Sequence, residues 1–167
     1  SDSGGGAGVQ ADIKSVTALG GFAATAITAL TAQNTVGVHD VFPVDVDFIQ
    51  KQMRVVLDDI SADSLKTGML HSSDVIEAVC AVIEIEAAGI PLVVDPVMVA
   101  KGGASLLDTD SVTTLRDRLL PLARVITPNI PEAEEILGKP GMISTVADMK
   151  QAAEALKAMG PGAVLVK

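Results

Sequence analysis

Two short apolar runs in this sequence end in polar groups that could do chemistry. Asp95 follows the run Pro-Leu-Val-Val at 91–94, and Thr-Pro-Asn at 127–129 follows Arg-Val-Ile at 124–126. An ionised carboxylate at the end of a buried strand is costly unless a metal ion or hydrogen bonds stabilise it. Ligands of open α/β sheets bind outside the carboxyl ends of the strands. We therefore expect Asp95 to hold Mg²⁺ and orient phosphate groups, in preference to the alternative of a loop cap.

Two neighbouring segments offer further groups for a phosphate. Lys101 stands before two glycines, where a lysine can close over phosphate as a mobile point charge, although an ordinary surface charge is the alternative. Asn129 and Glu132 bracket the start of a helix that Pro131 opens. The positive end of that helix could bind nucleotide phosphate or metal-coordinated water. The alternative is that Asn129 is the N-cap and Glu132 stabilises the first turn.

The amino-terminal third of the chain carries polar groups of another kind. The segment 1–8, Ser-Asp-Ser-Gly-Gly-Gly-Ala-Gly, leads into a helix, and its glycines would let amide N–H groups converge on a ligand. A flexible tail is the alternative. Asp12 is expected in the first turn of that helix, where an acid is stabilised by the helix dipole. The side-chain amides of Gln33 and Asn34 could read the polar edge of a nitrogen heterocycle, or they could form a turn.

Helical and strand-like segments alternate along the chain and must position these groups. Apolar spacing predicts helices at 10–19, 47–60, 72–88, 110–120, from 131 onward, and at 145–159. Strands are predicted at 64–69, 91–97, 124–127 and 163–166; residues 22–33 are ambiguous, and 34–46 look extended with turns. Ile76, Val79, Cys80 and Ile83 should be buried in one helix, and Val146, Met149, Ala153 and Leu156 should share a face in another. This alternation predicts an α/β three-layer sandwich with a mostly parallel sheet.

Composition excludes several classes of protein. Hydrophobic residues make up 49% of the 167 and charged residues 20%, which excludes a disordered chain. A net charge of −9 and the absence of Trp and Tyr argue against a nucleic-acid-binding protein. Cys80 is the only cysteine, which fits a reducing compartment. No apolar run has the length of a membrane span, and no signal peptide precedes the first helix, so a cytoplasmic location is expected.

The order of five segments resembles one family closely. These segments are SDSGGGAGVQADIK at 1–14, TALTAQNTVGV at 28–38, KTGML at 66–70, VDPVMVAKGG at 94–103 and ITPNIPEA at 126–133. Together they are similar to the hydroxymethylpyrimidine/phosphomethylpyrimidine kinases of thiamine biosynthesis, in the ribokinase-like superfamily. The resemblance implies ATP and Mg²⁺ as cofactors, a small pyrimidine as substrate, no nucleic-acid or membrane partner, and a homodimer at full length.

The resemblance also assigns residues. It implies that Gln33 bonds the aminopyrimidine, with Asp12, Gly8 and Met69 lining the same pocket. Asp95 and Glu132 should serve the metal, and phosphate or nucleotide should be bound by Lys101, Asn129 and Lys167.

The resemblance leaves two alternatives open. One is pyridoxal kinase of the same superfamily, and the other is a fragment that binds the pyrimidine without catalysis. Family members begin with a strand ahead of Ser1 and continue past Lys167, so the resemblance predicts a ribokinase-like sheet that is incomplete at both ends. It places the catalytic residues beyond Lys167 and none of them within these 167 residues.

Overall fold

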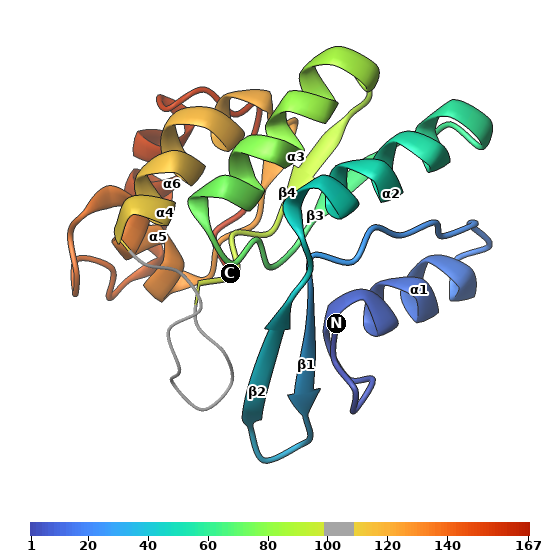
Figure 1. Cartoon of the computed structure of the whole chain (residues 1–167). Coiled ribbons are helices and arrows are strands. Elements are labelled where there is room, and N and C mark those ends of the chain that lie inside the picture. The colour runs from blue at the N-terminus through green and yellow to red at the C-terminus, as the bar shows by residue number, and fades with distance from the viewer. Residues whose placement is uncertain (99–108) are drawn as a thin grey trace.

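A computed structural model describes residues 1–98 and 109–167 of the chain (Figure 1). Helices and strands alternate along most of it, as the sequence predicts. The elements are α1 (Gly8–Ala18), β1 (Ala29–Gln33), β2 (Val38–Pro43), α2 (Val46–Asp59), β3 (Leu65–Thr67), α3 (Ser73–Glu86), β4 (Leu92–Val94), α4 (Thr109–Thr114), η1 (Leu115–Leu119), η2 (Leu120–Leu122), β5 (Val125–Ile126), α5 (Ile130–Leu137) and α6 (Val146–Lys157).

A parallel sheet in the order β3-β4-β5 forms the centre of the molecule. β4 is its middle strand; Leu92 and Val94 are buried on one face, and Val93 is half-buried on the other. The segment predicted as a last strand makes a single parallel bridge, from Val164 to Ile126. Its backbone bonds continue along β5, since the Lys167 amide donates to the Pro128 carbonyl at 2.9 Å. This pairing places residue 167 at the carboxyl end of β5.

The helices pack along this sheet and against one another. α2 packs on α3, α3 on α4 and η1, and α5 on α6 (Figure 1). All four residues predicted to face inward from α3 are buried: Ile76, Val79, Cys80 and Ile83. The α/β prediction is confirmed. No helix in the part of the chain that the structure describes is both long enough and apolar enough to cross a membrane.

Two predicted helices differ from the observed ones. Residues 110–120 do not form one regular helix, because α4 passes into a π-helical turn and then a 3-10 turn that contains Pro121. Proline has no N–H for the helical ladder and disturbs the preceding turn. In α6, the prediction that Val146 faces inward is wrong, since it is 68% exposed. Leu156 is buried as predicted, together with Ala152, and six residues of helix place Val146 roughly 120° around the axis from Ala152.

Only the end of the ambiguous segment 22–33, Ala29–Gln33, forms an arm of a hairpin. β1 and β2 pair antiparallel, and the hairpin projects away from the central sheet (Figure 1). Ala29 and Thr31 are buried on one face, whereas Leu30 and its cross-strand partner Phe42 are exposed on the other. Gln33 is the last residue of β1 and lies near the turn of the hairpin. The hairpin, and not the parallel sheet, therefore positions it.

Candidate functional site

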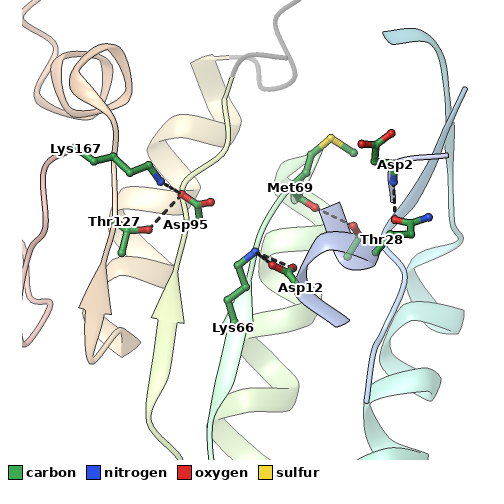
Figure 2. A network of polar contacts seen from close by, with 9 residues as sticks. Asp2, Asp12, Thr28, Lys66, Met69, Asp95, Thr127 and Lys167 are labelled. Atoms are coloured by element: carbon green, nitrogen blue, oxygen red, sulfur yellow. Dashed lines mark hydrogen bonds and ion pairs between the residues drawn. The ribbon is translucent and has the colours of Figure 1, made fainter. Parts of the chain in front are cut away.

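Asp95 lies at the carboxyl end of β4 and is stabilised by two side chains from further along the chain. Its Oδ1 accepts from Lys167 Nζ at 2.7 Å and from Thr127 Oγ1 at 3.2 Å (Figure 2). Both donors come from the segments that follow or pair with β5. The carboxylate is therefore contacted by a cation and a hydroxyl, and both contacts use the same oxygen.

Asn129 and Glu132 form a capping box at the start of α5. The Asn129 Oδ1 accepts from the Glu132 amide at 2.9 Å, and the Glu132 Oε2 accepts from the Asn129 amide at 2.9 Å. The capping interpretation of these residues is thereby confirmed. Glu132 is only 6% exposed. Burial raises the pKa of its carboxyl, the nearby charge of Asp95 raises it further, and the Asn129 amide and Lys167 oppose that rise.

A magnesium ion would fit this end of the sheet only with help from water and phosphate. Among the described residues, no three carboxylate, histidine or cysteine side chains gather closely enough to hold a metal ion alone. Mg²⁺ keeps several waters and is usually bound by one or two carboxylates together with substrate phosphates. Asp95, with one oxygen engaged by Lys167 and Thr127, suits that mode of binding. The predicted phosphate ligand Lys101 lies outside the described residues.

Asp12 lies beside β3 rather than in the first turn of α1. The helix begins at Gly8, so Asp12 falls in its second turn, and the expected interaction with the helix dipole is wrong. Its carboxylate pairs with Lys66 Nζ instead, with both oxygens within 2.9 Å (Figure 2). Lys66 therefore points from β3 toward α1 and joins helix to sheet.

The other residues predicted to bind substrate gather around the segment 1–8. Gln33 is tied to this segment through Ser3, whose hydroxyl donates to the Gln33 carbonyl at 2.7 Å, and its side-chain Oε1 accepts from Thr31 Oγ1 at 3.2 Å. Met69 is anchored by its carbonyl, which accepts from Thr28 Oγ1 at 2.8 Å. The Met69 side chain extends toward Asp2 (Figure 2). The neighbouring Asn34 forms a turn, as one of its two interpretations predicts, since its Oδ1 accepts from two following amides.

Gly8 lies where the chain passes close to itself. Its φ is +56°, and an added Cβ would meet the Ser1 carbonyl carbon at 3.0 Å and the Asp2 nitrogen at 3.1 Å. Both the backbone conformation and the close approach favour glycine. The segment 1–8 is thus packed against the start of α1, which contradicts its interpretation as a flexible tail.

Asp2 is a buried carboxylate that the sequence interpretation did not select. Its carboxylate accepts from the amides of Gly4 at 2.8 Å, Gly6 at 3.0 Å and Ala7 at 2.8 Å. The amide groups that were expected to converge on a ligand therefore converge on a side chain of the same segment. The signal in the sequence was an aspartate two residues before a glycine run, since Asp bonds backbone amides of a following turn.

The acid stability of the protein should report on Asp2. Burial alone would raise the pKa of the Asp2 carboxyl, but the amides of the following turn, Gly4 foremost, hold that pKa below its usual range. Such a group stabilises the fold above its unfolded-state pKa, and the stabilisation is lost as the pH falls through the folded-state pKa. We expect the gap in unfolding free energy between wild type and Asp2→Asn to be largest at neutral pH and to shrink below about pH 4. Urea denaturation at a series of pH values measures this gap; a constant gap would contradict the assignment.

Comparison with known proteins places the chain among kinases. A family model described as phosphomethylpyrimidine kinase matches residues 2–167. The hydroxymethylpyrimidine/phosphomethylpyrimidine kinase of Bacillus subtilis is 51% identical over 167 residues, which are 100% of this chain and 60% of that protein. The chain thus spans about three fifths of the length of this curated relative.

Solved structures agree with this placement. The phosphomethylpyrimidine kinase of Clostridium difficile superposes with a TM-score of 0.90 at 45% identity, over 100% of this chain and 71% of that one. The pyridoxal kinase of Staphylococcus aureus, in complex with pyridoxal, gives a TM-score of 0.87 at 36% identity, over 100% of this chain and 61% of that one. Such similarity extends the fold assignment to the ribokinase-like kinases, as the resemblance in the sequence implies.

Proposed function

The chain belongs to the phosphomethylpyrimidine kinase family, and from that membership we propose that it takes part in the ATP-dependent phosphorylation of 4-amino-5-hydroxymethyl-2-methylpyrimidine and of its monophosphate. The observation that carries the proposal is the placement of two polar clusters on adjacent strands. The Asp12–Lys66 pair lies over β3 and the Asp95 cluster ends β4 (Figure 2). The two strands are locked in register there, since the Asp95 amide donates to the Thr67 carbonyl at 3.0 Å.

The first cluster is proposed to bind the pyrimidine. Gln33 and Asp12 offer an amide and a carboxylate, which together can accept from and donate to an aminopyrimidine edge. Met69 supplies an adaptable apolar surface for the ring, and Gly8 lets the backbone approach closely. Lys66 keeps the Asp12 carboxylate in place through its two contacts.

The second cluster is proposed to serve the phosphates. Phosphoryl transfer depends mainly on positioning and on neutralising charge at the transferred group. Lys167 supplies a cation beside Asp95, and Asn129 stands at the positive end of α5. Asp95 is the proposed ligand of Mg²⁺, with Glu132 behind it; when bound, the ion would neutralise phosphate charge. Lys101 is proposed to reach the transferred phosphoryl group.

Pyridoxal is the second candidate substrate. The similarity to the Staphylococcus aureus pyridoxal kinase covers the whole of this chain. Pyridoxal and the pyrimidine each present a hydroxymethyl group on a nitrogen heterocycle, so one arrangement of residues suits both. A homodimeric state and a cytoplasmic location stay predictions.

Phosphorylation assays test the proposal directly. The longest chain that the gene encodes is incubated with ATP, Mg²⁺ and either the pyrimidine or pyridoxal, and the phosphorylated products are separated and quantified. We expect kcat/KM for the pyrimidine to exceed that for pyridoxal. A preference for pyridoxal would favour the second candidate, and pyrimidine binding without any product would favour a non-catalytic binding protein.

A further inference from the structure

We propose that Asp2 is a positioning residue of the pyrimidine site, which fixes the glycine-rich segment 3–8 so that Gly8 and Met69 face the heterocycle. This inference rests on the proposed function. It adds to the site a residue whose carboxylate accepts hydrogen bonds from the backbone and not from the substrate. Asp2 is 5% exposed. Because its oxygens are already bonded to backbone amides, its effect on substrate passes through the groups it holds.

The segment is organised around this one side chain. The Asp2 Oδ1 accepts from Gly4, and its Oδ2 accepts from both Gly6 and Ala7, at 2.8 to 3.0 Å. The Asp2 carbonyl accepts from the Gly5 amide at 2.9 Å. Four consecutive amides are thus satisfied by one residue. An asparagine would retain one acceptor oxygen but turn an NH₂ group toward N–H donors.

Asp2 also connects the segment to α1 and lies close to Gly8 and Met69, two residues of the proposed pyrimidine pocket. Its own amide donates to Gln10 Oε1 in α1 at 2.7 Å. A Cβ atom added to Gly8 would lie 3.0 Å from the Ser1 carbonyl carbon and 3.1 Å from the Asp2 nitrogen. The Met69 side chain reaches toward Asp2 from the segment that follows β3 (Figure 2). Displacing Asp2 therefore shifts the boundary of the pocket on two sides.

The phosphate half of the site is built from other contacts. Asp95, Thr127 and Lys167 hold one another at the ends of β4 and β5. None of the contacts of Asp2 described above involves these three residues. The loss of Asp2 should consequently weaken the binding of the pyrimidine and spare the binding of ATP.

Titration calorimetry with the pyrimidine and with ATP tests this division in the longest chain that the gene encodes. In Asp2→Asn, the Kd of the pyrimidine should rise about tenfold and the Kd of ATP should stay within about twofold of wild type. Glu134→Gln is the matched control, because Glu134 also ties a glycine-containing loop through two amides, those of Gly141 at 2.9 Å and Ile143 at 2.7 Å. It should lower the melting temperature and leave the pyrimidine Kd unchanged.

Several results would overturn the proposal. They are an unchanged pyrimidine Kd in a folded Asp2→Asn protein, equal losses for pyrimidine and ATP, or an equal loss of pyrimidine binding in Glu134→Gln. If Asp2→Asn does not fold, Asp2→Glu decides the question, since it keeps the charge and lengthens the arm; its pyrimidine Kd should rise, and an unchanged value would refute the role. A wild-type protein without affinity for the pyrimidine would overturn the proposed function and this inference together, whereas an unaffected variant of a binding-competent wild type would overturn this inference alone.

Discussion

In the longest chain that the gene encodes, and under the proposed function, replacing Asp95 by asparagine should lower the turnover of pyrimidine phosphorylation about 100-fold or more while changing pyrimidine affinity by less than about twofold. The carboxylate accepts from Lys167 at 2.7 Å and from Thr127 at 3.2 Å. An amide in its place removes the charge that pairs with Lys167 and the oxygen donor best suited to Mg²⁺. The residues proposed to bind the pyrimidine lie in α1, in β1 and after β3 and keep their own contacts, so substrate binding should survive.

Steady-state kinetics and calorimetry on the same preparation separate the two quantities. Asp45→Asn is a suitable control, since Asp45 caps α2 through the Phe48 amide and asparagine caps equally well. It should leave both turnover and affinity unchanged. If Asp95→Asn lost pyrimidine affinity in proportion to turnover, with an unchanged circular dichroism spectrum, Asp95 would not act on phosphate and metal alone.

Replacing Gln33 by alanine should weaken pyrimidine binding by at least about tenfold, within the ~1–3 kcal/mol that a lost buried hydrogen bond usually costs. Gln33 ends β1, and its backbone is bonded twice to the Ser3 hydroxyl, so truncation of the side chain leaves the strand in place. The substrate would lose its amide partner while the hairpin stays intact. The ATP affinity should not change, because the residues proposed to bind phosphate and metal lie beyond the ends of β4 and β5 and not in the hairpin.

Calorimetry with the pyrimidine and with ATP provides the measurement. Gln50→Ala offers a comparison of the same chemistry, because the Gln50 amide donates to the Ala78 carbonyl between α2 and α3, at 3.1 Å. That variant should lose stability and keep its affinity for both ligands. Unaltered pyrimidine binding in Gln33→Ala would remove Gln33 from the site.

The sequence predicted best what depends on local pattern. The apolar spacing of α3 predicted its buried face, and the uninterrupted apolar run at 91–94 predicted the central strand β4, because a strand between two others in a parallel sheet is covered by helices. The sequence also offered the cap of α5 as one interpretation of Asn129 and Glu132, because residues three positions apart can form a capping box. These features are set by neighbours in the chain.

Contacts between distant segments could not be predicted in the same way. Lys66 pairs with Asp12 across 54 positions, and Lys167 pairs with Asp95 across 72. Neither pair follows from periodicity, because its geometry depends on the order of strands in the sheet. The role of Asp2 was missed for a related reason, since its burial results from the packing of the first residues against α1 and β1.

The order of strands has a consequence for how the protein is made. β3, β4 and β5 lie side by side in the order in which a ribosome produces them, and Val164 then pairs with Ile126 on the newest edge. Each strand after β3 therefore finds its neighbour already synthesised, and the sheet can grow in one direction as the nascent chain emerges. Lys167 reaches Asp95 only after that growth. Because Lys167 is made 72 positions after Asp95, a nascent chain that ends between them carries Asp95 without this cation.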